Sequence, residues 1–298
     1  MSKIEWTDVV LNPVTGCTRA SAGCDNCYAV KMTKRLQEIG DKKYIGLVND
    51  GKSHFNGVVK CHEDVLTKPL SWKKPKRVFV NSMSDLFHKD VPFEFIDKVF
   101  AVMALCPQHT FQILTKRPER MAEYFESRKL TLGELPFAVG DAMNGFVTGK
   151  MADHLDSIDA QWTWPLPNVW LGTSCENQEA ADERIPHLLK CPAAVRFLSI
   201  EPQIGPVDFR KVPGFNLCSG LMYDILSSFW VIVGGESGPG ARPFDPQWAL
   251  NLKAQCKAAG VPFFFKQMGS NPIGVQKLNS KGSDWVGFDE LRIREFPR

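Results

Sequence analysis

The sequence lacks several features that would assign a protein to a class at once. It contains no apolar run long enough to span a membrane, no apolar signal segment before Trp6, no fixed-period repeat and no low-complexity tract. The formal net charge is only +3, so the overall charge does not indicate a polyanionic partner. These absences argue against a membrane, repeat or disordered protein and favour a reducing cytoplasm as the compartment.

Paired cysteines at disulfide spacing are also missing. The chain has 9 cysteines in 298 residues, and three of them, Cys17, Cys24 and Cys27, form an odd group near the N-terminus. Six residues separate the first two and two residues separate the last two. An iron-sulfur cluster with one open iron uses three thiolates in this way. Zinc is the competing interpretation, because Cys-x2-Cys is also a zinc knuckle, and Cys61 and His62 could then complete the site.

The rest of the chain alternates short apolar runs with helical patterns, which indicates repeated βα units and an α/β fold. Most of the runs are apolar without alternation, as is typical of parallel strands buried on both faces. The expected strands are Val9 to Leu11, Val78 to Asn81, Phe111 to Thr115, Val169 to Gly172, Val195 to Ile200, Trp230 to Gly234 and Pro262 to Lys266, with a further candidate at Val58 to Cys61. At this length one domain of residues 1–298 can form a single parallel barrel.

Helix boundaries are readable between these strands. Asp90 and Pro92 start one helix, and Asp245 and Pro246 start another that ends at Gly260. A third helix begins at Tyr28, directly after the cysteines, and ends at Gly40. Two segments, 136–167 and 205–228, interrupt the alternation and are interpreted as loop insertions on the barrel.

Polar residues follow the predicted strands, and in a parallel barrel this end carries the working groups. Carboxylates there can accept hydrogen bonds from an ammonium group, and the cations can pair with a carboxylate. The glycines 234, 235 and 238 let a ligand approach the backbone, and Cys175 is a further candidate for chemistry. The polar set comprises Asn81, Ser82, Ser84, Asp85, Thr115, Lys116, Arg117, Thr173, Ser174, Glu176, Arg184, Ser199, Glu201, Glu236, Arg242, Lys266 and Gln267.

Together with the cysteines, these strand-end residues resemble the motifs of a known protein superfamily. The chain resembles the radical S-adenosylmethionine superfamily, and more closely its phage-associated three-cysteine-motif family, a domain of unknown function; it is more distantly similar to the spore photoproduct lyase branch. The segments that carry the resemblance are Ile4-Glu5-Trp6-Thr7, Asn12-Pro13, Gly16-Cys17, Cys24 to Ala29, Ser82 to Phe87, Leu114 to Pro118, Leu171 to Ser174, Ser199 to Pro202 and Gly234 to Gly238.

The resemblance implies a partial (β/α) barrel of mostly parallel strands and a 4Fe-4S cluster held by Cys17, Cys24 and Cys27. S-adenosyl-L-methionine would bind the open iron, and its reductive cleavage would give a 5′-deoxyadenosyl radical that abstracts hydrogen from a substrate. An electron donor such as flavodoxin or ferredoxin is then a required partner. The resemblance places the cofactor among Tyr28, Ser82, Ser84, Asp85, Lys116, Ser174, Arg184, Glu201, Gly234, Gly235 and Glu236.

Within that set, the resemblance puts Ser84 and Asp85 near the amino group of the cofactor. Lys116, Ser174 and Arg184 would lie near its carboxylate or ribose, and Glu201 with the Gly234 to Glu236 turn near the adenosine or the substrate. The expected substrate is DNA or a modified nucleotide, with a base isomerised or rearranged during phage DNA hypermodification in the host cytoplasm.

The sequence departs from the common superfamily motif in one place. That motif has three residues between its first two cysteines and an aromatic residue before the last, whereas six residues follow Cys17 here and Asn26 precedes Cys27. Two other classes stay open: a zinc-binding, non-catalytic nucleic-acid-binding protein, and a degenerate barrel that acts as a scaffold. A basic stretch around Trp72 suits the first of these; it consists of Lys68, Lys73, Lys74, Lys76 and Arg77.

Overall fold

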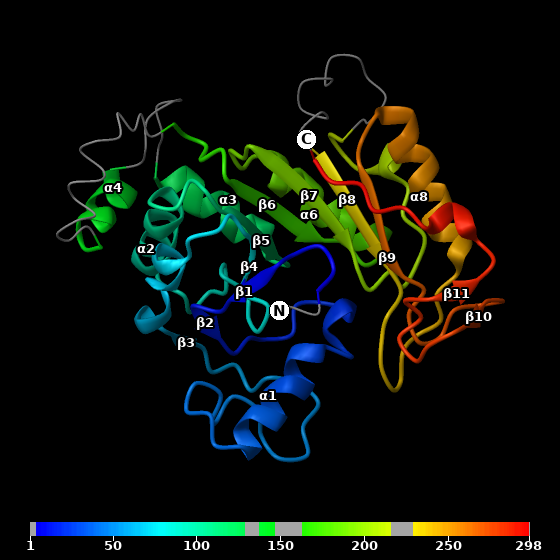
Figure 1. The fold of residues 1–298 in the computed structure, drawn as a ribbon, viewed down its shortest axis with the longest axis horizontal. Coiled ribbons are helices and arrows are strands. Elements are labelled where there is room, and N and C mark those ends of the chain that lie inside the picture. Colours follow the sequence, from blue (N-terminus) through cyan, green and yellow to red (C-terminus); the bar gives the residue numbers. More distant parts are fainter. Residues whose placement is uncertain (1–3, 129–136, 147–162, 216–228, 298) are drawn as a thin grey trace.

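A curved sheet of seven parallel strands forms the centre of the computed structural model, which describes residues 4–128, 137–146, 163–215 and 229–297. Its strands are β1 (Val9–Leu11), β4 (Arg77–Val80), β5 (Thr110–Thr115), β6 (Val169–Ser174), β7 (Val195–Ile200), β8 (Phe229–Gly234) and β9 (Phe263–Gln267), which are neighbours in this order. The sheet curls into a half-barrel (Figure 1). The predicted partial (β/α) barrel is therefore confirmed.

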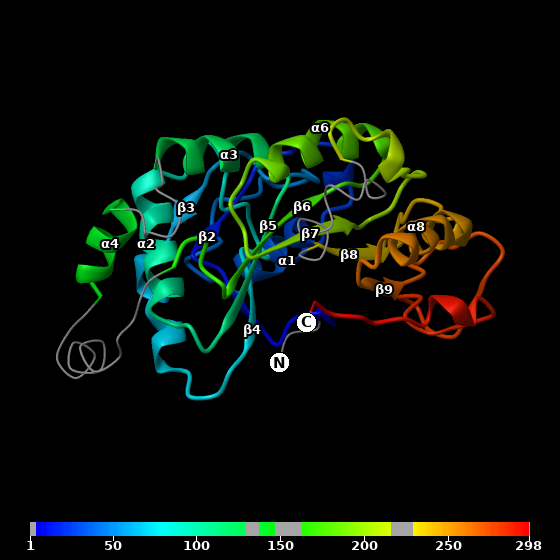
Figure 2. The ribbon, with the colours of Figure 1, turned by 90° about the horizontal axis from the view of Figure 1, so that it is seen from above.

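Helices cover the convex side of this sheet (Figure 2). They are α2 (Phe93–Ala104), α3 (Pro118–Ser127), α6 (Gln178–Leu189) and α8 (Pro246–Ala259), and α4 (Phe137–Asn144) lies beyond α2. The predicted helix signals are confirmed: Asp245 Oδ1 accepts a hydrogen bond from Gln247 N at 2.9 Å, and Gly260 ends α8 in the left-handed conformation at φ +67°.

Each strand of the sheet is apolar on both faces, which explains why the sequence shows no alternation. In β8, Val231 and Val233 belong to the large core beneath the helices, whereas Trp230 and Ile232 belong to a second cluster on the concave face. Parallel strands buried on both sides require this pattern.

An aromatic cluster fills the concave face. Trp6, Phe79, Phe197, Trp230 and Phe264 are all buried there, and the rings of Trp6 and Phe79 are 4.7 Å apart. Trp6 precedes β1, and Phe197, Trp230 and Phe264 occupy the first halves of β7, β8 and β9, so the C-terminal ends of these strands are left for polar groups. The barrel interior is therefore packed at one end and polar at the other.

One predicted strand does not belong to the main sheet. The candidate at Val58 to Cys61 forms only β3 (Lys60–Cys61), which pairs antiparallel with β2 (Val14–Thr15) outside the main sheet. Cys61 is exposed, and the run is too short and too polar to be buried on both faces. The other small sheet pairs β10 (Gln276–Lys277) with β11 (Trp285–Val286).

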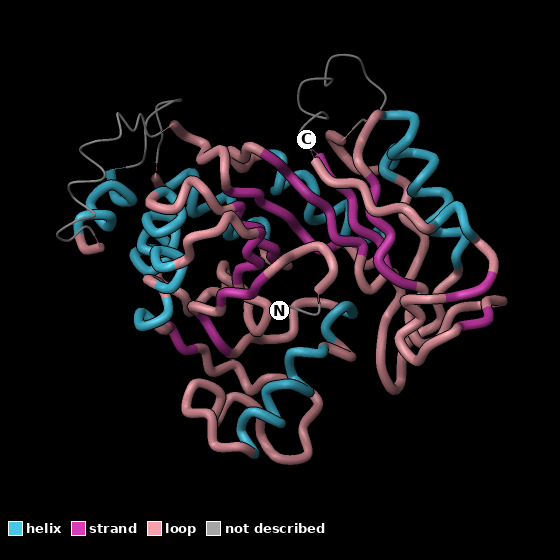
Figure 3. Tube along the Cα trace, viewed as in Figure 1, coloured by secondary structure: helices cyan, strands magenta, loops and turns pink. Residues whose placement is uncertain are grey.

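Helix α1 (Tyr28–Glu38) lies apart from the helical layer (Figure 3). It is at the side toward which the strand arrows of the main sheet point (Figure 1). Within the predicted insertions the structure describes α4, residues 163–167 and residues 205–215, and the remainder lies outside the described residues. Short 3₁₀ helices complete the described chain: Ala22–Cys24, Glu63–Val65, Lys68–Ser71, Phe209–Lys211 and Asp289–Leu291. No helix in the described part is both long and apolar enough to cross a membrane.

Candidate active site

The three clustered cysteines lie on one loop, residues 17–27, called the cysteine loop below. It connects the β2 strand to α1 and contacts residues that follow β5, β6 and β8. The loop therefore lies across the C-terminal ends of the parallel strands, where catalytic groups of such barrels gather. Hydrogen bonds with three sets of charged side chains hold it there.

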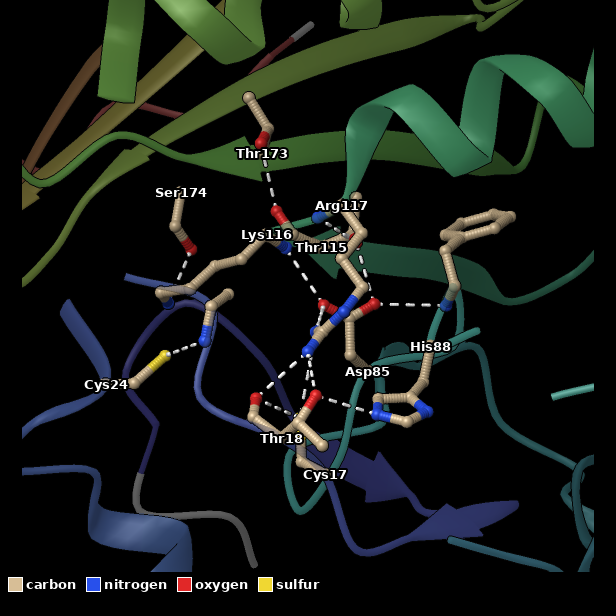
Figure 4. Close-up of polar contacts among 12 residues, drawn as sticks. Cys17, Thr18, Cys24, Asp85, His88, Thr115, Lys116, Arg117, Thr173 and Ser174 are labelled. Atoms are coloured by element: carbon tan, nitrogen blue, oxygen red, sulfur yellow. Dashed lines mark hydrogen bonds and ion pairs between the residues drawn. The ribbon is translucent and has the colours of Figure 1, made fainter. Parts of the chain in front are cut away.

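Arg117, at the start of α3, makes the first contact (Figure 4). Its Nη2 donates to the carbonyl oxygen of Thr18 at 2.9 Å and to Thr18 Oγ1 at 2.8 Å. Its Nη1 lies 3.7 Å from Cys17 Sγ and donates to Asp85 Oδ2 at 2.9 Å. One guanidinium thus joins the first cysteine, the next residue of the loop and the end of β4.

Asp85 holds this guanidinium in place. Its Oδ2 also accepts from Lys116 N at 3.0 Å, and its Oδ1 accepts from Thr115 Oγ1 at 2.7 Å and Phe87 N at 3.0 Å. A carboxylate has about four acceptor positions, and Asp85 uses four inside the protein. The buried Asp85 therefore organises the strand ends and the loop.

His88 supports the same loop residue. Its Nδ1 accepts from Asp90 N at 3.2 Å, which leaves Nε2 as the donor to Thr18 Oγ1 at 2.9 Å. Burial, with the nearby charge of Arg117, lowers the pKa of His88, so the imidazole is neutral at neutral pH. A neutral ring is required for one nitrogen to accept while the other donates.

Glu176, after β6, makes the second contact. Its Oε1 accepts from Gly23 N at 3.1 Å, and its Oε2 accepts from Arg184 Nη1 at 3.0 Å. Burial raises the pKa of Glu176, but the charge of Arg184 and hydrogen bonds to the carboxylate outweigh burial and lower it overall. A Cβ at Gly23 would be 2.9 Å from the Glu176 carboxyl carbon, so a side chain at position 23 would require the carboxyl group of Glu176 to shift.

The turn after β8 makes the third contact. Glu236 Oε2 accepts from Asn26 Nδ2 at 2.9 Å and from Arg242 Nε at 3.0 Å, while Arg242 Nη1 donates to the carbonyl oxygen of Ala22 at 2.8 Å. Burial acts to raise the pKa of Glu236, but hydrogen bonds from Arg242 and Asn26 lower it overall. Asn26, the residue before Cys27, is thus a tether of the loop.

The three cysteines are each half-buried. Cys24 Sγ accepts from Ala20 N at 3.5 Å, and Cys17 Sγ receives the Arg117 contact described above. Cys27 packs against a small apolar cluster that contains Met83. Burial and the Asp85 carboxylate raise the pKa of the Cys17 thiol to about 12, although Arg117 acts in the opposite direction.

Zinc and a 4Fe-4S cluster place different demands on the geometry of the three cysteines. In the described residues no group of three or more His, Cys, Asp or Glu side chains is arranged to hold one metal ion. Zinc needs its ligands to converge on a single centre, and the described geometry does not provide this. A four-iron cluster binds its three thiolates to three different irons, so those sulfurs do not share one centre. Three half-buried thiols, two of them with N–H groups nearby, fit such a cluster as a donor set.

Lys116 follows β5 and Glu201 follows β7, and the two residues differ in their partners. Lys116 Nζ donates to Ser174 Oγ at 3.2 Å, and no carboxylate of the described residues lies within ion-pair distance of it. Lys266 Nζ instead pairs with Glu201. Lys116 is therefore a half-buried cation at the strand ends that has no carboxylate partner among the described residues.

Other predicted cofactor residues already have partners in the chain. Ser84 Oγ donates to the Val14 carbonyl at 2.8 Å, Ser82 Oγ donates to Asn12 Oδ1 at 3.1 Å, and the Tyr28 hydroxyl donates to the Ser82 carbonyl at 2.6 Å. Arg184 is buried, and its Nη1 also donates to the Ser174 carbonyl at 2.8 Å. These groups fix the edges of the site.

The glycine turn after β8 approaches its own chain closely. A Cβ on Gly235 would lie 2.2 Å from the Met268 carbonyl oxygen, and Gly235 N donates to the Gln267 carbonyl at 2.9 Å. A Cβ on Gly234 would meet only ordinary contacts at 3.5 Å. The predicted close approach is therefore made at Gly235 by β9 and the residue that follows it.

Cys175 packs in the main hydrophobic core, fully buried, and its burial raises the pKa of its thiol well above the usual range. We assign it a packing role. Cys61 lies outside the cysteine loop, and His62 Nε2 is 2.8 Å from Thr15 Oγ1. The basic stretch around Trp72 precedes β4 and so lies at the opposite end of the sheet from the loop.

Six residues that hold the cysteine loop or its partners lie outside the cofactor set predicted from the sequence: Arg117, Glu176, Arg242, Asn26, Thr18 and His88. Arg117 and Glu176 were visible as polar strand ends, which was the available signal. Thr18 and His88 carried no signal, because their contact joins positions 70 residues apart.

The fold and the site together define a parallel α/β half-barrel whose strand ends carry a tethered three-cysteine loop. Residues 1–295 match the family described as "Protein of unknown function (DUF5131)", and the chain belongs to this family. No curated protein matches the sequence significantly. No solved structure matches it significantly either.

Proposed function

We propose that the protein is a radical S-adenosylmethionine enzyme that holds a 4Fe-4S cluster on Cys17, Cys24 and Cys27. The observation that carries the proposal is the tethering of this loop across the C-terminal strand ends by Arg117, Glu176 and Glu236. A loop whose cysteines served only for packing has no need of three sets of hydrogen bonds with charged side chains. A cluster of this kind, when bound, supplies one electron to a sulfonium cofactor.

Residues around the cysteine loop would have separate roles in binding the cluster and the cofactor. Arg117 and the Ala20 N–H stabilise charge on the sulfurs of Cys17 and Cys24, because N–H groups near a thiolate favour its ionised form. Lys116, whose charge lacks a carboxylate partner in the described chain, is placed to bind the carboxylate of an amino-acid cofactor. Asp85 keeps both cations in position.

The test is anaerobic reconstitution of the full chain with iron and sulfide, followed by iron, sulfide and zinc analysis. We expect a brown protein with about four irons and, after reduction with S-adenosylmethionine, release of 5′-deoxyadenosine. The triple variant Cys17→Ala, Cys24→Ala, Cys27→Ala should bind no cluster, whereas Cys61→Ala, which alters an exposed thiol outside the loop, should bind it normally. A colourless, zinc-containing wild type would overturn the proposal.

The substrate belongs to the same proposal. A base in DNA must be unpaired or turned out of the helix before a radical can reach it, so single-stranded DNA and duplex DNA with a mismatch are the first substrates to test. Consumption of the base, followed by mass spectrometry of the digested DNA, is the readout. Uncoupled 5′-deoxyadenosine release that no DNA stimulates would exclude this substrate class while leaving the cluster chemistry in place.

A further inference from the structure

Exposed apolar side chains are concentrated next to the cysteine loop. Eight large hydrophobic residues are exposed among the described residues, and five of them lie between residues 28 and 58. Three of the five are on α1, where Tyr28 is 53% exposed, Met32 is 44% exposed and Ile39, which caps the helix, is 71% exposed. Clustered exposed apolar groups mark interaction sites more often than scattered ones do.

These three residues share one face of the helix. Positions 28, 32, 35 and 39 repeat at intervals of four and three, so Tyr28, Met32, Arg35 and Ile39 form a single line along α1, called the α1 stripe below. The buried residues Ala29, Val30 and Thr33 lie on a different face of the helix. The helix thus buries one face and presents a second face, apolar and basic, to the solvent.

The segment that contains the α1 stripe is rich in positive charge. Residues 28–60 contain seven basic and three acidic residues, whereas the rest of the chain has a small acidic excess. Lys43 pairs with Asp64, but Lys34, Arg35 and Lys42 have no ion-pair partner in the part of the chain that the structure describes. Unpaired cations around apolar residues complement an acidic protein surface and speed association with it.

The α1 stripe begins directly after the cysteine loop. Tyr28 directly follows Cys27, and its hydroxyl is fixed to the Ser82 carbonyl after β4. α1 lies on the side toward which the strands run, as the cysteine loop does (Figure 1). A protein bound to the stripe would therefore lie beside the loop.

We propose that the α1 stripe is the docking surface for an acidic protein that delivers one electron to a cluster on the cysteine loop; this rests on the proposed function. The electron passes from the reduced carrier, which is oxidised by one electron, to the cluster, which is reduced by one. Contacts between redox partners are small and steered by charge, as this stripe with its flanking cations would be.

The composition of the stripe favours a protein over a nucleic acid. Platforms for single-stranded nucleic acid stack successive bases on several aromatic rings, and Tyr28 is the single aromatic residue of the α1 stripe. Tyrosine, methionine and arginine are the residue types enriched at protein interfaces.

The test uses the reconstituted full chain, with a flavodoxin as the acidic one-electron carrier. Stopped-flow bleaching of the cluster absorbance measures reduction by the reduced flavodoxin and, separately, by dithionite, which needs no docking. The variant Arg35→Glu reverses one charge of the stripe, and Met32→Glu removes an apolar contact. Lys257→Glu, on the exposed side of α8, makes the same charge change on another helix and is the matched control. Iron content and circular dichroism verify that each variant is loaded and folded.

We expect Arg35→Glu and Met32→Glu to slow reduction by flavodoxin about tenfold at low salt, with the dithionite rate unchanged. Lys257→Glu should stay within about twofold of wild type, and added salt should slow the wild type more than Arg35→Glu. Equal effects of Arg35→Glu and Lys257→Glu on iron-loaded protein would overturn the docking surface alone. Binding of single-stranded DNA that Arg35→Glu abolishes would assign the stripe to nucleic acid instead. Failure to incorporate iron would overturn the proposed function, and the docking proposal with it.

Discussion

The replacement Glu176→Gln tests the tethering of the cysteine loop most directly. The Glu176 carboxylate and the Arg184 guanidinium are 1% and 3% exposed, so the pair is shielded from solvent. Glutamine keeps the shape but removes the charge, and it leaves Arg184 buried without a counter-ion. Removing one partner of a buried ion pair costs about 3–5 kcal/mol. For a chain of this size about 2 °C of melting temperature accompanies each kcal/mol, so we expect a fall of roughly 6–10 °C.

The matched control is Asp289→Asn. Asp289 also pairs with an arginine, Arg292, but its side chain is 82% exposed, so the change should cost less than about 1 kcal/mol. Differential scanning fluorimetry of both variants and of wild type in one buffer gives the comparison. The reasoning is refuted when the two variants melt within about 2 °C of each other.

A second readout separates loosening of the loop from general destabilisation. Glu176 accepts the N–H of Gly23, the residue before Cys24. Its loss should therefore speed alkylation of Cys24 by iodoacetamide at a temperature where the protein stays folded, whereas the buried Cys256 should stay unmodified. Peptide mass spectrometry measures both sites in the same sample. Unchanged alkylation of Cys24 would mean that the hydrogen bond does not restrain the loop.

Three further changes test other parts of the description. The pKa of Glu236 is lowered in the folded protein, so the ionised carboxylate contributes its full stabilisation above the ordinary pKa near 4.5 and loses it as the pH falls through the lower folded pKa. The difference in melting temperature between wild type and Glu236→Gln should therefore be largest at pH 7 and shrink below pH 4.5. Gly235→Ala would force a Cβ to 2.2 Å from the Met268 carbonyl oxygen, and we expect urea unfolding to show a loss of about 3 kcal/mol in stability. The control Gly234→Ala should show no measurable loss, because the nearest contacts of its Cβ are 3.5 Å away. Trp230→Ala removes the largest fully buried side chain of the concave cluster and should lower the free energy of unfolding by about 3–5 kcal/mol with an unchanged urea m-value. A loss below about 1 kcal/mol would mean that the concave face is not packed.

The main sheet could be predicted from the sequence because its signals are local. Each strand is a short apolar run, and Asp245 with Gly260 sets the ends of α8 within a few residues of where they act. The candidate at Val58 to Cys61 failed because a short run with Lys60 and an exposed Cys61 can pair at the surface as well as in a barrel. The sequence does not distinguish these two environments for so short a run.

The candidate site could be predicted only as a list of residues, because its contacts are long-range. Glu176 meets Gly23 across 153 positions, and Asn26 meets Glu236 across 210. Polar strand ends indicated that these carboxylates would gather at one edge, but nothing local indicated that they would bind the cysteine loop. Asp85 shows the same limit: it was expected beside a cofactor amino group, and its four acceptor positions serve Arg117, Lys116, Thr115 and Phe87.

The long interval between Cys17 and Cys24 has a structural explanation in these contacts. Extra loop residues cost little closure entropy, but unrestrained they would leave the cysteine positions poorly defined. Here the interval contains the short helix Ala22–Cys24, and both sides of it are fixed: Arg117 binds Thr18, Glu176 binds Gly23 and Arg242 binds Ala22. The added residues are therefore the ones that the strand ends bind. It follows that deleting Thr18, Ala22 and Gly23, which would shorten the interval to three residues, would remove the partners of Arg117, Arg242 and Glu176 and leave the buried Glu176 carboxylate with one hydrogen bond fewer.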